Sequence, residues 1–236
     1  MIKFTDVYKT YNQKRWALKK VNCEIEQGEF VYLVGKSGAG KTTFLKLLTL
    51  EEPLTRGALQ IGNANLTTMT EKQLPMFRRQ LGIVSQNLAL LENMTVLENI
   101  LYVLRATDFG GRYAKKRALE ALAEVDLVDV QKKKPEELSI GQRQKVLIAR
   151  AIVNQPKIIL ADEPTGNLDD KSAIETMRIF FRLNQKGTTV IMSTHHSTIV
   201  NTVRHRVLEI NEGQIVRDQS EGSYGQPTDG RDIFYI

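Results

Sequence analysis

The first residues that could do chemistry form a glycine-rich segment. Gly35-Lys36-Ser37-Gly38-Ala39-Gly40-Lys41-Thr42 fits the pattern G-x-x-x-x-G-K-[S/T]. Glycines let such a segment curl, so that successive backbone N–H groups point at phosphate oxygens, and a helix that follows adds its positive dipole end. We therefore predict that residues 35–43, Thr43 included, bind a nucleoside triphosphate. Lys41 would reach the β- and γ-phosphates and Thr42 would ligate Mg²⁺.

Two adjacent carboxylates follow an apolar segment later in the chain. Residues 158–161 have the composition of a buried strand, and Asp162 and Glu163 come directly after them. Ligands of open α/β sheets lie beyond the carboxyl ends of the strands. We expect Asp162 to hold Mg²⁺ through its water shell. Because successive strand residues point to opposite sides, Glu163 would face the attacking water as general base.

Two further apolar segments end in polar side chains that could reach the same phosphate. Gln86 follows the β-like residues 81–85, and His195 follows residues 188–193 and Thr194. Gln86 could contact both Mg²⁺ and the attacking water, and His195 could donate a hydrogen bond to the γ-phosphate. Both predictions depend on the glycine-rich segment, because neither side chain would indicate a site by itself.

A second anion site is predicted at the start of a helix. Ser139, followed three residues later by Gln142, fits a capping box that would begin a helix at about residue 141. The same helix start, with Ser139 and Gly141, could also bind an anion. One nucleotide needs a single glycine-rich loop in its own chain. The second site is therefore expected to serve a nucleotide that is bound by another copy.

The elements that must position these residues alternate along the chain. Residues 30–34 are a continuous run of β-formers, and residues 42–48 have a helical apolar face. Further strands are expected near residue 4 and at 16–26, 58–62, 81–85, 158–161 and 188–193. Helices are expected at 71–79, 141–154 and 171–185, with a lobe of two or three helices over 95–130. Strands that alternate with helices predict an α/β fold with a parallel sheet covered on both faces.

Composition excludes several classes of protein. With 236 residues, 42% hydrophobic and 25% charged, the chain is neither disordered throughout nor a collagen-like or coiled-coil fibre. No apolar run approaches the ~18 residues of a membrane span, and the N-terminus lacks the apolar core of a secretory signal. One cysteine, Cys23, excludes an internal disulfide and a cysteine-based zinc site. These features indicate a cytoplasmic protein. Its net charge of +6 would suit an anionic partner, but a solubilising surface is the better explanation of the charge taken alone.

The ordered set of motifs resembles the ATP-binding subunit of ABC transporters, over residues 1–217. The resemblance implies a P-loop NTPase (RecA-like) parallel sheet core with an N-terminal antiparallel β part and an inserted α-helical subdomain at about 87–155. It implies one domain over residues 1–236, with a loose tail at 218–236. The cofactors would be ATP and Mg²⁺. By resemblance the motifs are the Walker A loop 35–42, the Q-loop Gln86, the signature 138–142, the Walker B strand 158–163, the D-loop 168–169 and the switch His195. Tyr11 would be the aromatic residue that stacks on adenine, and Tyr8 and Trp16 are the less favoured candidates.

Residues 159–169, ILADEPTGNLD, narrow the resemblance to the branch of cell-division (FtsE), lipoprotein-release and macrolide-export ATPases. Residues 78–84, 90–91, 95–96 and 151–156 are most similar to the FtsE group. This implies a homodimer on ATP, a peripheral place on the inner face of the cell membrane, an FtsX-like permease partner and control of cell-wall hydrolysis. The alternatives are an exporter ATPase of the same branch and a hydrolysis-poor nucleotide-dependent switch. No nucleic acid is expected as a partner. ABC-type proteins that act on nucleic acids usually carry long coiled-coil or other additional domains, and none fits in 236 residues.

Two residues depart from the family pattern. Ile140 stands where the signature usually has glycine, and His196 where an aspartate usually follows the switch histidine. Ile140 would be strained by about 1 kcal/mol or more if its φ were positive, but tolerable if its backbone were helical and its side chain pointed away. We expect function to survive, and we assign the switch role to His195 because it directly follows Thr194.

Overall fold

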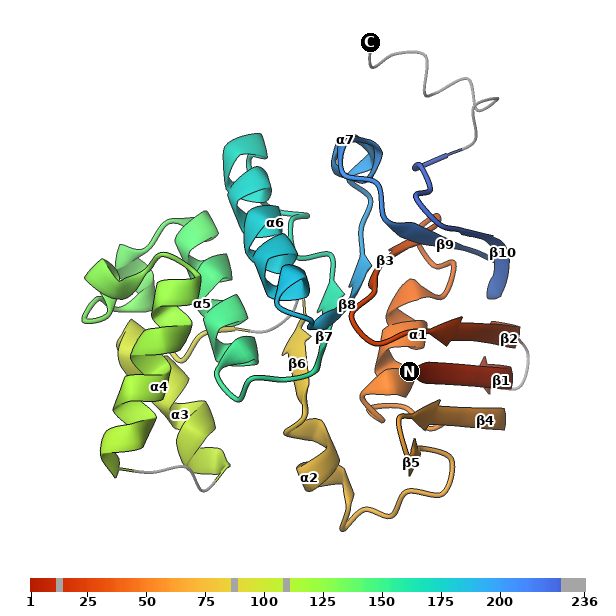
Figure 1. Ribbon diagram of the computed structural model, residues 1–236, viewed down its shortest axis with the longest axis horizontal. Helices are drawn as coiled ribbons and strands as arrows, with labels where there is room; N and C mark the ends of the chain where they lie inside the picture. Colours follow the sequence, from red (N-terminus) through yellow and green to blue (C-terminus); the bar gives the residue numbers. More distant parts are fainter. Residues whose placement is uncertain (12–14, 86–88, 108–110, 226–236) are drawn as a thin grey trace. The chain divides into compact units, whose positions relative to one another are not determined.

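The computed structural model describes residues 1–11, 15–85, 89–107 and 111–225 (Figure 1). The chain forms two compact units. The first unit combines Met1–Met69 with Ile191–Ile236, and the second is Thr70–Val190. The α/β fold predicted from the alternation of strands and helices is confirmed, and each unit holds its own part of the predicted site.

An antiparallel sheet forms one part of the first unit. It contains β1 (Ile2–Thr10), β2 (Trp16–Ile25), β4 (Arg56–Ile61) and β5 (Ala64–Asn65), in the order β2-β1-β4-β5. From Val21 to Ile25 alternate side chains of β2 are buried, as the period of a half-buried strand requires. Helix α1 (Lys41–Leu48) packs on this sheet, where Phe44 stacks on Phe4 with ring centroids 4.3 Å apart.

A second set of strands in the first unit leads to the glycine-rich segment. Strand β3 (Phe30–Val34) is buried along its whole length and pairs in parallel with β9 (Arg206–Asn211). Strand β10 (Gln214–Gln219) pairs antiparallel with β9, and helix α7 covers Ser197–Thr202. The loose tail expected over 218–236 is wrong at Asp218 and Gln219, which are strand residues, and residues 226–236 of that segment lie outside the described residues.

The second unit is mainly helical. It contains α2 (Leu74–Arg78), β6 (Leu81–Val84), α3 (Val96–Ala106), α4 (Gly111–Glu124), α5 (Ile140–Ile152), β7 (Ile158–Asp162) and α6 (Asp170–Gln185), with 3-10 turns at Val128–Val130 and Pro135–Glu137. Strand β8 (Thr189–Ser193) lies where the chain passes from the second unit to the first. Strands β6 and β7 pair in parallel, and α3, α4 and α5 gather beside one another (Figure 1). The helical pattern predicted over 95–130 contains two separate helices, α3 and α4.

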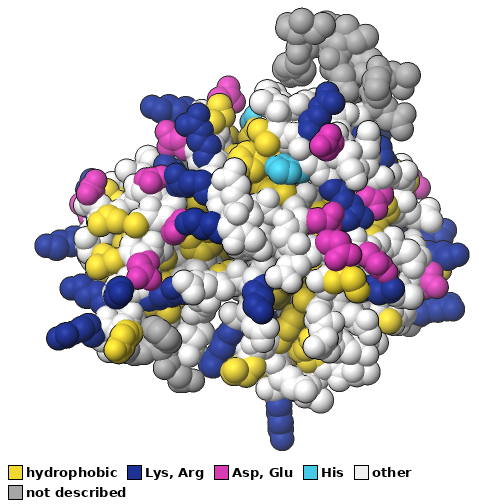
Figure 2. Space-filling model, viewed as in Figure 1, with side chains coloured by type: hydrophobic (Ala, Val, Ile, Leu, Met, Phe, Trp, Pro, Cys, Tyr) yellow, Lys and Arg dark blue, Asp and Glu magenta, His cyan; other side chains and the backbone are white. Residues whose placement is uncertain are grey.

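Two predictions from composition concern membrane-spanning helices and the excess positive charge. Within the described ranges no helix is both long and apolar enough to cross a membrane. Lys and Arg side chains are spread over the visible face with Asp and Glu among them, instead of forming one basic patch (Figure 2). This distribution agrees with a solubilising role for most of the excess positive charge.

The pairing of β6 with β7 yields a stability prediction at Gly82. A Cβ at this position would lie 2.8 Å from Cγ of Pro156 and 2.9 Å from the carbonyl oxygen of Ala151. Both groups are held in packed backbone, so we expect Gly82→Ala to lower the free energy of unfolding by about 1–3 kcal/mol. Urea denaturation measures this change.

Gly166→Ala is the matched control, because its Cβ would meet no atom closer than 3.5 Å. Equal stabilities of the two variants would contradict the tight approach of β6 to the loop between α5 and β7.

Candidate nucleotide-binding site

The glycine-rich segment forms a curled loop between β3 and α1. Gly35 and Gly40 have φ values of +141° and +117°. A Cβ at Gly35 would overlap the carbonyl oxygen of Ile210, and one at Gly40 would lie 2.6 Å from that of Ala17. Gly40 is the N-cap of α1 and supplies no side-chain hydrogen bond to the first turn. No N-cap side chain therefore competes with an anion for the first turn of this helix.

Lys41 is the first residue of α1 and is only 6% exposed. Its ammonium donates to the carbonyl oxygens of Gly35, at 2.8 Å, and Lys36, at 3.2 Å. It also lies 3.1 Å from Nε2 of His195. Since an ammonium can only donate, Nε2 accepts and the ring proton is on Nδ1. The fold thus joins two residues of the predicted site that are 154 positions apart.

The neighbouring His196 has a different setting. Its backbone N–H donates to Oγ1 of Thr194 at 3.0 Å, and the residue is the N-cap of α7. The backbone N–H of Thr194 donates to the carbonyl oxygen of Leu33 in β3 at 3.2 Å, which fixes the chain directly before His195. Of the two adjacent histidines, His195 is the one that contacts Lys41.

Tyr11 lies beside the loop, at a cavity of the first unit. Its hydroxyl is 3.3 Å from Oγ1 of Thr43, and the Lys9 ammonium lies 4.8 Å from the centre of its ring. The cavity measures about 700 Å³, within the range of small-molecule sites. It is lined by Tyr11, Arg15, Trp16, Ala17, Lys19, Gly38, Thr43, Glu212 and Gly213. Tyr8 is not among them, and it packs edge-on against Trp16 with ring centroids 5.4 Å apart.

The predicted carboxylates lie in the second unit, and one expectation about them is wrong. Strand β7 ends at Asp162, and Glu163 has a left-handed backbone with φ of +49°. Strand alternation therefore does not orient Glu163. The residue begins a turn in which the N–H of Gly166 donates to its carbonyl oxygen at 3.2 Å. Non-glycine residues with positive φ are uncommon and concentrate at functional sites.

The predicted capping box at Ser139 is present. Oγ of Ser139 accepts from the backbone N–H of Gln142 at 3.2 Å, and Oε1 of Gln142 accepts from that of Ser139 at 3.1 Å. Ile140 is the first residue of α5 and is not among the residues with positive φ. Its side chain is 66% exposed. The strain considered for Ile140 is thus absent.

Gly141 has a packing role that the sequence did not indicate. A Cβ here would lie 2.8 Å from Oγ of Ser172, in the first turn of α6. Asp169, the N-cap of α6, accepts from both the backbone N–H and the hydroxyl of Ser172, at 3.0 and 2.7 Å. These hydrogen bonds hold the pKa of Asp169 below its ordinary value. The Asp-x-x-Ser spacing is a helix-start pattern that could have revealed Ser172.

Two features complete the account of the predicted residues. Gln86 lies outside the described residues. Across the described ranges, no group of three or more His, Cys, Asp and Glu side chains could hold a metal by itself. Mg²⁺ at this site would therefore need the Thr42 hydroxyl, one or two other protein oxygens and the phosphates of the nucleotide, which is the usual mode for this ion.

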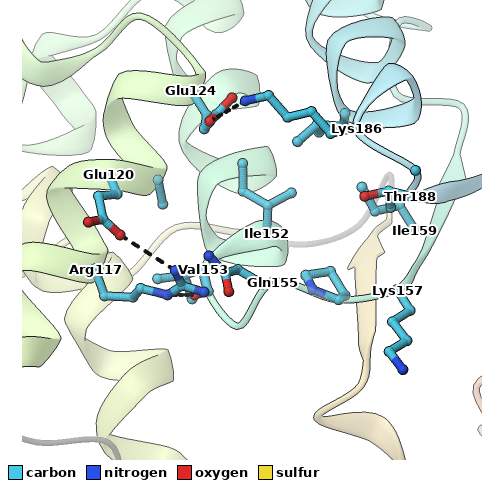
Figure 3. Close-up of a pocket in the computed structure, with 14 residues that line it drawn as sticks. Arg117, Glu120, Glu124, Ile152, Val153, Gln155, Lys157, Ile159, Lys186 and Thr188 are labelled. Carbon is cyan, nitrogen blue, oxygen red and sulfur yellow. Dashed lines mark hydrogen bonds and ion pairs between the residues drawn. The ribbon is translucent and has the colours of Figure 1, made fainter.

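A cavity of about 490 Å³ in the second unit contains none of the predicted site residues (Figure 3). Arg117 lies 3.5 Å from Glu120, and Lys186 lies 2.5 Å from Glu124. Nε of Arg117 also donates to the carbonyl oxygen of Val153 at 3.1 Å. Most of the charges around this cavity thus pair with one another, and we do not assign it to the nucleotide.

The backbone at Ile140 yields a prediction about the signature. Replacing Ile140 by glycine should leave the free energy of unfolding unchanged or lower it by up to about 1 kcal/mol, because glycine costs entropy in a helix and there is no strain to relieve. Ile140→Ala separates the loss of the side chain from that entropy. Urea denaturation measures all three proteins. If Ile140→Gly were more stable than both the unchanged protein and Ile140→Ala, the helical backbone at this position would be contradicted.

Comparisons with known proteins agree with this geometry. The family model described as ABC transporter matches residues 18–166. Curated relatives named cell division ATP-binding protein FtsE are 45% identical in Streptococcus pneumoniae, over 95% of this chain and 98% of the relative. The relative of that name from Bacillus subtilis is also 45% identical, over 95% and 99%. In Escherichia coli K12 the identity is 38%, over 91% and 97%.

Solved structures give the same result for the fold. A dimeric structure of the ABC transporter cassette MJ0796 superposes with a TM-score of 0.84 at 36% identity, over 95% of this chain and all of that one. A second dimeric structure of MJ0796, in a post-hydrolysis state bound to ADP and Pi, has the same TM-score at 35% identity, over 95% and 100%. The family match and the identity over nearly the whole length lead to one conclusion: this chain belongs to the ABC transporter family, as an ATP-binding subunit.

Proposed function

We propose that this chain hydrolyses ATP as the nucleotide-binding subunit of a cell-division membrane complex, and that two copies close on the nucleotide. The observation that carries the proposal is the buried Lys41 ammonium, held 3.1 Å from His195 at the start of α1. The names of the relatives, at 38–45% identity, support the cell-division assignment.

In this proposal the first unit binds the nucleotide. The loop residues Gly35, Lys36, Ser37, Gly38, Ala39 and Gly40, with Lys41, Thr42 and Thr43, surround the phosphates with N–H groups and one ammonium. Lys41 exchanges the carbonyl oxygens of Gly35 and Lys36 for β- and γ-phosphate oxygens, which are stronger acceptors. Adenine stacks on the ring of Tyr11, which is 55% exposed at the cavity.

Hydrolysis uses further residues of the predicted site. Glu163 orients the attacking water and accepts its proton, and His195 donates a hydrogen bond to the γ-phosphate. Thr42, Asp162 and Gln86 would hold Mg²⁺, which would neutralise charge on the β- and γ-phosphates. The left-handed backbone of Glu163 supports this role, because it aims the side chain independently of the strand that precedes it.

The second copy completes the site with its signature. Ser139 and Gly141 of one copy contact the γ-phosphate bound by the other, and the exposed side chain of Ile140 at this helix start supports an approach by a partner. The dimeric structures of the related cassette support a paired arrangement. The triphosphate then bridges the copies, and its cleavage lets them separate.

Closure on ATP is tested by the oligomeric state. Glu163→Gln should give stable dimers with ATP and Mg²⁺, because binding is retained while the water is no longer activated. Lys41→Ala should give none, because the charge that holds the phosphates is lost. Sedimentation in the analytical ultracentrifuge measures both. Glu120→Gln, an exposed residue of α4, is the matched control and should behave as the unchanged protein. A Glu163→Gln variant that stays monomeric at saturating ATP and Mg²⁺ contradicts this closure.

A groove in the second unit is the proposed contact for an FtsX-like permease. It measures about 350 Å³ and is lined by Pro75, Arg78, Arg79, Leu81, Ile83, Val103, Ala106, Thr107, Leu147, Arg150, Ala151 and Asn154. Apolar side chains and three arginines suit a short helix with one apolar face and acidic ends. Arg79 and Arg150 are fixed in place by carbonyl oxygens of Ala106 and Ala89, at 3.3 and 2.9 Å. Binding there would hold the chain on the inner face of the cell membrane.

Charge reversal at the groove tests this contact. Arg78→Glu should reduce co-purification of an FtsX-like permease about tenfold or more, because an acidic segment would be repelled, while ATP binding stays unchanged. Lys115→Glu, on an exposed part of α4, makes the same charge change elsewhere and should have no effect. If co-purification of the Arg78→Glu variant were unchanged, the permease would not bind in this groove. Recovery of a lipoprotein- or drug-export permease instead would favour the exporter alternative.

We further propose that residues 1–236 act as one ATP-binding domain, with about 87–155 as its helical part. The unstrained backbone at Ile140 favours an active ATPase over a switch that binds ATP without turnover. Measurement of phosphate release separates the two, because the switch would bind ATP and release no phosphate.

A further inference from the structure

The segment that follows β10 returns to the predicted site within the first unit. The N–H of Gly222 donates to the carbonyl oxygen of His205 at 2.9 Å, and the N–H of Tyr224 donates to Oδ1 of Asn201 in α7 at 2.7 Å. Figure 1 shows this segment running from β10 toward α7. These two hydrogen bonds place the Tyr224 hydroxyl 3.4 Å from Nδ1 of His195.

Both ring nitrogens of His195 therefore have a partner. Lys41 donates to Nε2 at 3.1 Å, so the proton of the neutral ring is on Nδ1 and points at the hydroxyl oxygen of Tyr224. From this arrangement we infer that Tyr224 is a positioning residue for His195, holding the imidazole so that Nε2 faces the γ-phosphate. The inference rests on the proposed function, in which His195 donates to that phosphate.

A hydroxyl suits this task because it can both donate and accept. With Lys41 on Nε2, the ring donates from Nδ1 and Tyr224 accepts. When Lys41 moves to a phosphate, Nε2 must carry a proton to donate. The exposed ring takes that proton from water and releases the Nδ1 proton to water, so that Nδ1 becomes an acceptor. Tyr224 then donates to Nδ1, and the ring keeps its orientation through the exchange.

The expected consequences differ from those of a residue that binds nucleotide. Tyr224 does not line the cavity beside Tyr11. Removing its hydroxyl should therefore lower kcat about three- to tenfold, the usual effect of losing one hydrogen bond, and leave KM for ATP unchanged. Because tyrosine and phenylalanine have the same ring, Tyr224→Phe should keep the packing of the segment. Asn201→Ala should act in the same direction by freeing the N–H that anchors Tyr224.

The experiment uses the full chain and two readouts. The first is the ¹⁵N shifts of the His195 ring without nucleotide, in the unchanged protein and in Tyr224→Phe. We expect a protonated Nδ1 and an unprotonated Nε2 in the former, and a shift toward mixed tautomers in the latter. The second is steady-state ATPase, with His195→Ala as the reference for complete loss. Tyr113→Phe is the matched control, because Tyr113 is 76% exposed on α4 in the second unit.

Each result decides one of the two claims. A lower kcat with unchanged KM and altered ring shifts in Tyr224→Phe supports the positioning role. Ring shifts and kcat equal to those of the unchanged protein overturn it, provided that His195→Ala is inactive. An active His195→Ala variant would instead contradict the proposed role of His195 in hydrolysis, and the ring shifts alone would then decide whether Tyr224 holds the imidazole.

Discussion

The buried ammonium of Lys41 is the interaction on which the first unit depends. A positive charge that is removed from water costs several kcal/mol unless it is hydrogen-bonded. Here the carbonyl oxygens of Gly35 and Lys36 and the Nε2 of His195 accept from it. Two of these acceptors belong to the residues directly after β3 and the third follows β8, so the ammonium joins segments that are far apart in the sequence. In the proposed function, negatively charged phosphate oxygens replace these neutral acceptors.

Helix starts in this molecule are of two kinds. Thr95, Ser139 and Asp169 each accept from the first turn of their own helix, α3, α5 and α6. Gly40, at the start of α1, has no side chain that could do so. The three capped helices satisfy part of their backbone internally, whereas no N-cap side chain competes with an anion at the start of α1.

Local sequence patterns predict much of this site, but they do not predict contacts between residues that are far apart in the sequence. The loop at 35–42, the strand before it and the capping box at Ser139 depend on neighbouring residues, and the structure has all of them. Strand alternation fails to predict the orientation of the Glu163 side chain, because β7 ends at Asp162 and the alternation does not continue to the next residue. Tyr224 was assigned to a loose tail, because its position depends on hydrogen bonds to Asn201 and His195, which no spacing reveals.

Helix α5, which begins at the signature residue Ser139, and helix α6, which follows Asp169, are tightly coupled in the second unit. Gly141 lets the start of α5 approach Ser172 so closely that a methyl group would not fit. Further along, Lys145 of α5 lies 2.7 Å from Glu175 of α6, an ion pair that lowers the pKa of Glu175. A packed contact and a short ion pair together oppose sliding of one helix along the other. A force on Ser139 would therefore displace Asp169 as well, so that the start of α5 and the start of α6 respond as one body.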